Sequence, residues 1–388
     1  MREKGLDAEA LEVYHHEPDI SGFDVLASPV HLPPGNPALE AAKALGIETV
    51  THHRAVGALL FEDKDFRVFE ITGTHSKTST ALVLSRILSF ERKVVSHTTR
   101  GVELWQGGES QIIKAGLSIT PGNVIYAFDA ARANEADDLI CEISLGGTGL
   151  ADYGVLTSFA GDYRIANDSM WASKAKLQMV ELAAPGSKLV ANADTGTAPD
   201  LSFGEGGKVQ CTSKELRMGQ DRCALELGEN FDPQSYLTAL SAASAVAIAS
   251  GLGPVKIASA LKGFDGLRGR MKRTYEKGMI VYDNSNSGLK VSGVEEALDY
   301  SLGEGQLGLV VGEEAETVCE GMNVPELVEL LRLRREGIDV LILVGERLEP
   351  YAAKLRASTA PDLVSGQSIV EGALDRGDRI LTCVKCFR

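Results

Sequence analysis

A glycine- and threonine-rich segment reads Phe69-Glu-Ile-Thr-Gly-Thr-His-Ser-Lys-Thr-Ser-Thr80. It overlaps an apolar run that predicts a strand over residues 67–72, and it leads into a helical pattern over residues 78–89. A strand, a loop with glycine and lysine, and a helix form the arrangement that binds polyphosphates, because backbone N–H groups and the helix N-terminus supply positive potential. In such a loop the lysine neutralises outer phosphate oxygens and the next hydroxyl ligates Mg²⁺. The segment therefore predicts a phosphate-binding loop (P-loop) with Lys77 and Thr78 in these roles.

The loop departs from the common P-loop pattern at two positions. Ser76 stands where a glycine usually precedes the lysine, and Ile71 stands where the first glycine would be. The motif alone leaves open a chance Gly/Thr-rich turn, but its place between a strand and a helix favours phosphate binding. We expect His75 to contribute its backbone rather than its imidazole. The candidate nucleotide contacts in the loop are Gly73, Thr74, His75, Ser76, Lys77, Thr78 and Ser79.

Short apolar runs alternate with helical patterns on both sides of the loop, which is typical of a parallel α/β fold. The predicted strands are 23–27, 47–51, 138–143, 154–158, 188–191, 279–283, 307–311, 340–344 and 379–384. The predicted helices are 38–45, 53–60, 236–250, 324–335 and 347–357. We expect three domains: a short N-terminal α/β domain over 1–65, a central ATP-binding domain over 66–284, and an α/β C-terminal domain over 285–388.

Composition restricts the function further. A chain of 388 residues with a net charge of −15 lacks the excess Lys and Arg that nucleic-acid binding needs, so we expect no nucleic-acid partner. No apolar run of about 18 residues predicts a membrane span, and the charged start lacks the apolar centre of a secretory signal. Six scattered cysteines indicate reduced thiols, which favours a cytoplasmic protein. The sequence does not predict an oligomeric state.

The loop resembles that of the Mur ligases, which reads approximately T-G-T-x-G-K-T-T-T and also lacks the leading glycine. Several later phrases resemble the same family in the same order. They are Asp137-Asp-Leu-Ile-Cys-Glu-Ile-Ser144, Gly161-Asp-Tyr163, Trp171-Ala-Ser-Lys-Ala-Lys-Leu177, Leu189-Val-Ala-Asn-Ala-Asp194, Gly269-Arg-Met271 and Val281-Tyr-Asp-Asn284. The resemblance implies a three-domain Mur ligase-like architecture, with a P-loop central domain and Rossmann-like flanking domains.

The same resemblance implies roles for individual residues, with ATP and Mg²⁺ as cofactors. Thr78 and Glu142 would bind the metal, and Lys174 would be a carbamylated lysine that also ligates it. Arg270 would reach the terminal phosphate, and Asp283 would bind the nucleotide. The implied catalytic residues are Lys77, Lys174 and Arg270.

Each of these roles has a simpler alternative. Glu142 could be a paired carboxylate at a strand end, and Lys174 a solvent-exposed helix residue. Asp283 could cap the turn that follows its strand. Another cation of the basic run, which contains Arg268, Arg270, Lys272 and Arg273, could be the phosphate contact.

The sequence also departs from the cell-wall ligases. Thr238 stands where the family commonly has an asparagine that touches adenine. The N-terminal domain resembles only the second half of the usual first domain, and the strand and Gly-rich turn that face a uridine nucleotide are absent. We therefore do not expect a UDP-sugar substrate.

Within the family, five phrases resemble the coenzyme F-430 synthetases. They are His97-Thr-Thr-Arg-Gly101, Gly116-Leu-Ser-Ile-Thr-Pro121, Ser144-Leu-Gly-Gly-Thr-Gly149, Asp283-Asn-Ser-Asn-Ser-Gly288 and Val384-Lys-Cys-Phe-Arg388. This resemblance implies an ATP-dependent ligase that activates a propionate carboxylate of a nickel tetrapyrrole as an acyl phosphate. A carbon nucleophile of the same macrocycle would then close the last carbocyclic ring of coenzyme F-430. Separately, residues 97–100 follow the helix near where a substrate could enter, so a substrate-binding role for Arg100 is a further hypothesis.

Two other functions remain open at this point. An amide-forming ligase of the Mur or folylpolyglutamate type would show phosphate release that depends on an amino acid. A non-ligating ATP-binding switch would bind or slowly hydrolyse ATP without dependence on any carboxylic acid. Residues Glu142, Lys174, Arg270 and Asp283 would have no purpose in a switch, which favours a ligase.

Overall fold

The computed structural model describes residues 7–11, 18–314 and 321–387. The chain divides into two compact units. The first contains residues 1–225 and 237–261, and the second contains residues 226–236 and 262–388. No helix in the described part of the chain is both long enough and apolar enough to span a membrane.

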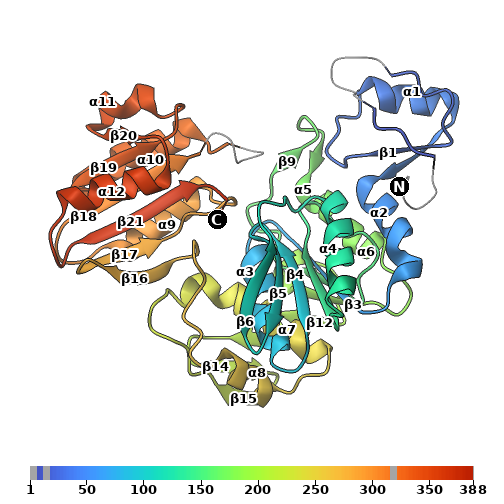
Figure 1. Ribbon diagram of the computed structural model, residues 1–388, viewed down its shortest axis with the longest axis horizontal. Coiled ribbons are helices and arrows are strands. Elements are labelled where there is room, and N and C mark those ends of the chain that lie inside the picture. Colours follow the sequence, from blue (N-terminus) through green and yellow to red (C-terminus); the bar gives the residue numbers. More distant parts are fainter. Residues whose placement is uncertain (1–6, 12–17, 315–320, 388) are drawn as a thin grey trace. The chain divides into compact units, whose positions relative to one another are not determined.

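The first unit is built on an eleven-stranded sheet with the order β15-β14-β13-β12-β11-β8-β3-β7-β4-β5-β6 (Figure 1). Its strands are β3 (Arg67–Thr72), β4 (Val94–Thr98), β5 (Gly101–Gln106), β6 (Glu109–Lys114), β7 (Asp138–Glu142), β8 (Tyr153–Leu156), β11 (Lys188–Asn192), β12 (Leu201–Phe203), β13 (Val209–Cys211), β14 (Glu215–Met218) and β15 (Asp221–Ala224). The run from β13 to β4 is parallel, whereas β14, β15, β5 and β6 are antiparallel. The carboxyl ends of β3, β4, β7 and β8 therefore meet at one edge, where open α/β sheets bind ligands.

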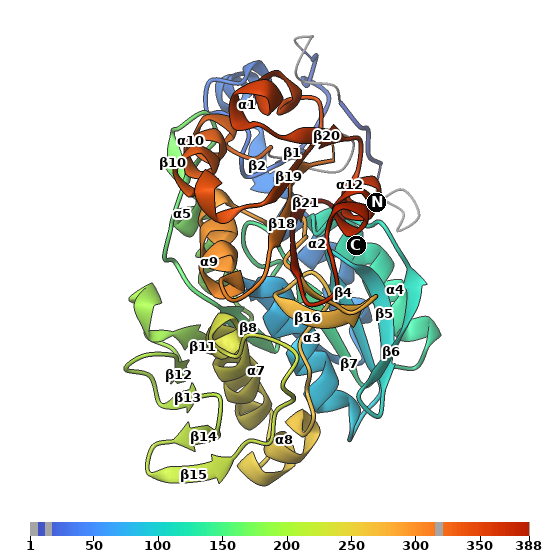
Figure 2. The same ribbon diagram turned by 90° about the vertical axis from the view of Figure 1, so that its left-hand side faces the viewer.

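Helices cover both faces of this sheet. They are α2 (His52–Leu60), α3 (Lys77–Ser89), α4 (Pro121–Ala133), α5 (Ala172–Lys176), α6 (Gln178–Glu181), α7 (Leu237–Ala249) and α8 (Pro254–Leu261). Helix α7 is rich in alanine and serine, so its backbone packs closely against α3 and against β11 and β13; Figure 2 shows α7 beside these strands. On the other face, α2 and α4 share a core with Val68, Val95 and Leu139 of the central strands.

The N-terminal part of the first unit is a small α/β element. Strands β1 (Val25–Ser28) and β2 (Glu48–Thr51) are parallel, and α1 (Pro37–Leu45) connects them. Helix α1 begins where the sequence predicts: Pro37 lies in its first turn, and the Asn36 side chain accepts a hydrogen bond from the Ala38 N–H at 3.0 Å. It ends at Gly46, which adopts the left-handed conformation at a φ of 71°. A short hairpin of β9 (Arg164–Ile165) and β10 (Met170–Trp171) precedes α5.

The second unit is a Rossmann-like sheet with the order β16-β17-β21-β18-β19-β20. Its elements are β16 (Lys272–Glu276), β17 (Met279–Asp283), α9 (Val291–Ser301), β18 (Leu307–Glu313), α10 (Val324–Arg334), β19 (Val340–Val344), α11 (Ala352–Leu355), β20 (Ser358–Ala360), α12 (Leu363–Ala373) and β21 (Arg379–Lys385). All pairs except β16–β17 are parallel. Leu309 and Val311 pack in one core and Val310 in another, as the two-residue strand period requires.

The predicted α/β class is confirmed, but the predicted boundaries and the observed units differ. Strands β16 and β17 join the C-terminal sheet, although the sequence placed residues 272–283 in the central domain. Residues 18–65, expected to belong to a separate domain, group with the central sheet when the chain is divided into two units, and the three-domain division stays a prediction. The helix predicted over 347–357 is reduced to α11 and a preceding 3₁₀ turn.

Candidate active site

The predicted P-loop lies between β3 and α3, at the centre of the eleven-stranded sheet. The Thr74 N–H and hydroxyl both donate to the Ser158 carbonyl, at 2.9 and 3.0 Å, which anchors the loop to the end of β8. Thr157 donates its hydroxyl proton to the His75 carbonyl at 2.6 Å. Ser76 adopts the left-handed conformation at a φ of 61°, and the Lys77 amine donates to the Gly73 carbonyl at 3.1 Å. The lysine therefore lies over the loop, as phosphate binding requires.

Gly73 has no room for a side chain, because an added Cβ would lie 2.0 Å from the Thr157 Oγ1, and its φ is 151°. We expect Gly73→Ala to displace the loop and to weaken MgATP binding about 10- to 100-fold, the equivalent of about 1–3 kcal/mol of backbone strain. Calorimetric titration with MgATP measures the loss. Gly122→Ala is the matched control, because nothing lies within 4 Å of an added Cβ there. Unchanged affinity in a folded Gly73→Ala protein would contradict this account of the loop.

A buried carboxylate faces the first turn of α3. Glu142, at the end of β7, is 2% exposed. Its two oxygens accept from the Thr78 hydroxyl at 2.9 Å and from the Thr99 N–H at 3.2 Å. The hydroxyl oxygens of Thr78 and Thr99 are 3.4 Å apart. Oxygen ligands of this kind suit Mg²⁺, which takes one or two carboxylates and completes its shell with water and substrate phosphates.

The two lysines of α5 differ in their surroundings. The Lys174 side chain is 66% exposed, and its amine lies 3.6 Å from a carboxylate oxygen of Glu181 on the surface. The Lys176 side chain is fully buried, and its amine donates to the Ser144 carbonyl at 2.6 Å. Ser144 follows Glu142 by two residues, so the amine of Lys176 is directed to the end of β7. The structure favours Lys176 over Lys174 as the lysine of this site.

The two lysines lie on different faces of this short helix. In the segment 172–178, Ala172, Ala175 and Lys176 are buried while Lys174 is exposed, which is the spacing of one helix face. Asp162 fixes the start of this helix, since its carboxylate accepts from the Ser173 N–H at 3.0 Å and from the Ser173 hydroxyl at 2.5 Å. The predicted Gly161-Asp-Tyr163 phrase therefore positions α5.

Arg270 and Asp283 lie together in the second unit. One oxygen of Asp283 accepts from the Gly269 N–H at 3.0 Å, and the other accepts from the Ser285 N–H at 3.1 Å. The Arg270 carbonyl accepts from the buried Tyr236 hydroxyl at 2.7 Å. These contacts fix the turn that carries Arg270, so Asp283 is at least a structural anchor, which was the simpler alternative for it.

Another buried carboxylate, Glu70 on β3, supports the loop that follows Glu142. Glu70 is fully buried and accepts hydrogen bonds from the Thr148 N–H at 2.9 Å and from the Thr148 hydroxyl. Burial raises the pKa of Glu70 to about 7, although the hydrogen bonds from Thr148 oppose this shift. Its one signal in the sequence is a charged residue within an apolar strand.

We expect Glu70→Gln to become more stabilising as the pH rises. The pKa of Glu70 rises from its usual value of 4.5 to about 7 on folding. Below pH 4.5 the carboxyl is protonated in both states, and the free energy of unfolding does not depend on it. As the pH rises towards about 7, the unfolded state loses this proton more readily than the folded state, so the free energy of unfolding falls. A shift from 4.5 to about 7 corresponds to about 3 kcal/mol. Urea unfolding should therefore show that the advantage of Glu70→Gln over the parent protein grows by up to about 3 kcal/mol between pH 4.5 and pH 8. The exposed Glu109→Gln is the control, and a pH-independent difference would refute the prediction.

Residues at and after the end of β4 lie at the same sheet edge. The Arg100 guanidinium donates to the buried Glu103 carboxylate at 2.8 Å. His97 is fully buried, and its Nε2 lies 3.1 Å from the Ser118 carbonyl. Burial lowers the pKa of His97 to about 4. The structure therefore gives Arg100 an intramolecular partner, and its predicted place near the substrate stays a prediction.

The chain is similar to proteins of known families. A family model described as "Coenzyme F430 synthetase CfbE, C-terminal domain" matches residues 273–386. The coenzyme F(430) synthetase of Methanosarcina acetivorans is 38% identical over 95% of this chain and 87% of its own length.

This chain belongs to the coenzyme F430 synthetase family.

Solved structures show how this synthetase-family chain is folded. A MurF crystal structure from Acinetobacter baumannii is similar with a TM-score of 0.64 at 15% identity, over 87% of this chain and 79% of that one. A structure of a bifunctional folylpolyglutamate synthase/dihydrofolate synthase from Yersinia pestis, complexed with AMPPNP and a Mn ion, is similar with a TM-score of 0.59 at 17% identity. The similarity covers 87% of this chain and 90% of that one. The synthetase-family chain therefore has the Mur ligase fold, and it is an ATP-dependent ligase. The comparisons support the use of ATP and a divalent metal ion.

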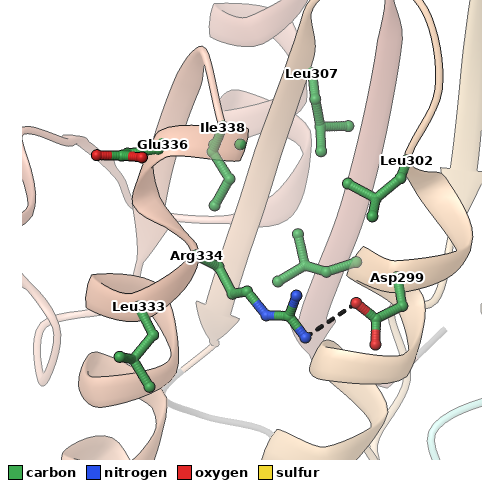
Figure 3. A pocket seen from close by; sticks show the side chains of 9 residues that line it. Asp299, Leu302, Leu307, Leu333, Arg334, Glu336 and Ile338 are labelled. Atoms are coloured by element: carbon green, nitrogen blue, oxygen red, sulfur yellow. Dashed lines mark ion pairs between the residues drawn. The ribbon is translucent and has the colours of Figure 1, made fainter.

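The synthetase-family chain also has a pocket outside this region. It has a volume of about 180 Å³ and lies in the second unit, beside α9 and α10 (Figure 3). Leucines and Ile338 line it, and Arg334 crosses it to pair with Asp299 at 3.0 Å. It contains none of the predicted site residues.

Proposed function

We propose that this ligase transfers the γ-phosphoryl group of ATP to a carboxylate of its substrate, and that a nucleophile then displaces phosphate from the acyl phosphate. A carboxylate is a poor electrophile, because its leaving group would be an oxide; phosphorylation makes phosphate the leaving group. The protein must hold ATP and the carboxylate in line and offset the charge on the phosphoryl oxygens. One observation supports this role most strongly. The loop over residues 73–79 faces a buried Glu142 through Thr78, which combines a phosphate site and a cation site.

Each residue of this site has a proposed part. The N–H groups at the start of α3 and the Lys77 amine bind the outer phosphates. Thr78 and Glu142 hold Mg²⁺, which would neutralise charge that develops on the phosphoryl group. Lys176 rather than Lys174 carries the carbamate proposed for this family: its amine attacks CO₂, loses a proton and becomes a further anionic oxygen ligand. The roles of Arg270 at the terminal phosphate and of Asp283 at the nucleotide stay predictions.

We propose that the substrate is a nickel tetrapyrrole acid. The relative that covers nearly the whole chain is a coenzyme F(430) synthetase, which supports this choice. The activated group would be a propionate carboxylate, and a carbon atom of the same macrocycle would attack it. A carbon–carbon bond then forms, the C–O bond to phosphate breaks, and the attacking carbon loses a proton.

Phosphate release tests this function. The purified protein is given MgATP and, in separate assays, a nickel tetrapyrrole propionic acid, a panel of amino acids with a carboxylic acid, or a UDP-sugar. We expect release only with the nickel tetrapyrrole acid. Release that needs an amino acid would replace this proposal with an amide ligase, and release that needs no carboxylic acid would replace it with a nucleotide switch.

A further inference from the structure

The turn between β4 and β5 lies beside the Glu142 carboxylate. Thr98 pairs with Gly101, so Thr99 and Arg100 alone form this turn, and Figure 2 shows the two strands side by side. The Thr99 N–H donates to a Glu142 oxygen at 3.2 Å. Arg100 is the next residue, and neighbouring Cα atoms are about 3.8 Å apart. The turn therefore places a cationic side chain one residue from a contact to the carboxylate proposed to bind Mg²⁺.

A buried carboxylate holds the guanidinium of this arginine. Arg100 donates from Nη2 to the Oε1 of Glu103 on β5 at 2.8 Å, and the Ser110 hydroxyl on β6 donates to the same oxygen at 3.1 Å. Glu103 is fully buried, whereas the Arg100 side chain is 29% exposed. The pair therefore fixes one end of the guanidinium and leaves the rest of it accessible at the sheet edge.

Stability does not explain this buried ion pair. Taking a carboxylate out of water costs several kcal/mol, and replacing a buried ion pair by apolar side chains is often neutral or stabilising. The second oxygen of Glu103, Oε2, also has no hydrogen-bond partner among the described residues. A carboxylate that is buried and incompletely hydrogen-bonded has another explanation here, because it fixes the direction of the Arg100 guanidinium.

The free side of the guanidinium suits an anion. Within the described part of the chain, Glu103 is the one hydrogen-bond acceptor of the Arg100 guanidinium, which leaves most of its N–H donors for a ligand. Its planar fork matches the two oxygens of a carboxylate or a phosphate. The net charge of −15 opposes the approach of an acidic substrate, so such a substrate needs a local cation. The nucleotide phosphates already have the loop N–H groups and Lys77, which favours a carboxylate as the partner of Arg100.

We propose that Arg100 binds the substrate carboxylate that is to be phosphorylated, and that Glu103 is the positioning residue that orients its guanidinium. This inference rests on the proposed function, because it assigns the group that holds the acid during activation. The contact is an ion pair with hydrogen bonds, and no covalent bond forms or breaks in it. The Thr99 N–H bonded to Glu142 keeps this carboxylate site beside the proposed metal site.

Binding titrations test the role of Arg100. The probes are a nickel tetrapyrrole propionic acid and the propionate methyl ester of the same macrocycle, added in separate experiments to the full chain. We expect the parent protein to bind the acid about 10- to 100-fold more tightly than the ester, because only the acid pairs with the guanidinium. Arg100→Ala should lose this preference by binding the acid more weakly and the ester unchanged. Arg100→Lys, which keeps the charge but not the planar fork, should retain only part of it.

A second variant tests the role of Glu103. Glu103→Leu removes the acceptor while it fills a similar volume, and a thermal melt shows whether it remains folded. If Glu103 positions the guanidinium, this variant should lower the preference for the acid at least about threefold and leave ester binding unchanged. If Glu103 only neutralises Arg100, the preference should rise, which would overturn the positioning role. Arg132→Ala, which removes an exposed arginine of α4, is the control and should keep the full preference.

Three results would overturn the carboxylate role. The parent protein could bind acid and ester equally, which would mean that it has no carboxylate site. Arg100→Ala could weaken both probes by the same factor, as a purely structural residue would. Calorimetry could show that Arg100→Ala loses affinity for MgATP and keeps its preference for the acid, in which case the guanidinium binds a nucleotide phosphate. We expect the affinity for MgATP to stay within twofold of the parent value.

Failure of the proposed substrate looks different. If neither probe binds the parent protein, the nickel tetrapyrrole assignment falls by itself. The role of Arg100 is then judged with whichever carboxylic acid drives phosphate release. The KM for that acid should rise at least about tenfold in Arg100→Ala, and an unchanged KM would overturn the role. If no carboxylic acid drives phosphate release, the proposed function and this inference both fall.

Discussion

Lys77→Ala is expected to reduce the kcat for phosphate release by about 10³-fold or more, because the variant lacks a positioned cation that stabilises the charge on the transferred phosphoryl group. Lys77 is the first residue of α3, and its amine lies over the loop at 3.1 Å from the Gly73 carbonyl. The loop over residues 73–79 contains no other lysine or arginine, so no neighbour in it can replace the charge. Phosphate release under saturating MgATP measures the effect.

The control for this variant is Lys114→Ala, which removes an exposed lysine at the end of β6. Its kcat should stay within twofold of the parent value. A thermal melt shows whether Lys77→Ala remains folded. A folded Lys77→Ala protein that retains more than about a tenth of the parent rate would mean that this lysine does not bind the transferred phosphoryl group.

Lys176→Ala is expected to reduce kcat by about 10²-fold or more, whereas Lys174→Ala should have little effect. The two residues lie in the same short helix, but only Lys176 is buried with its amine directed to the end of β7. If Lys176 carries a carbamate, depletion of CO₂ should lower the rate of the parent protein, and bicarbonate should restore it.

Two observations separate this chemical role from a structural one. Lys176→Ala should not respond to bicarbonate, and a small carboxylate such as acetate should recover part of its activity by supplying the missing oxygen ligands. Loss of the buried hydrogen bond to Ser144 alone would give neither result. The assignment fails if Lys174→Ala loses the bicarbonate response and Lys176→Ala keeps it.

The sequence predicted the elements whose signals are local. The strand over 67–72 coincides with β3, and the helix predicted over 78–89 coincides with α3 apart from Lys77. Apolar runs next to glycine, proline or asparagine mark such elements, as Asn36, Pro37 and Gly46 do for α1. Thr78 and Glu142, 64 residues apart, are in contact because parallel neighbouring strands end at the same sheet edge, and their binding of a metal ion stays a prediction.

Features that depend on tertiary contacts were not predicted. β16 and β17 join the C-terminal sheet through the pairing of β17 with β21, which lies about a hundred residues further along the chain, and no local signal reports that pairing. Lys174 and Lys176 are both lysines two positions apart, so only burial of one helix face distinguishes them.

The transfer of carboxylate oxygen is the most direct test of the proposed chemistry. The nickel tetrapyrrole propionic acid is labelled with ¹⁸O in its propionate carboxylate and turned over with unlabelled MgATP in unlabelled water. If an acyl phosphate forms and is then attacked at carbon, one labelled oxygen must leave with each phosphate, and mass spectrometry will find singly labelled phosphate. Release of unlabelled phosphate during product formation would contradict carboxylate activation on this loop.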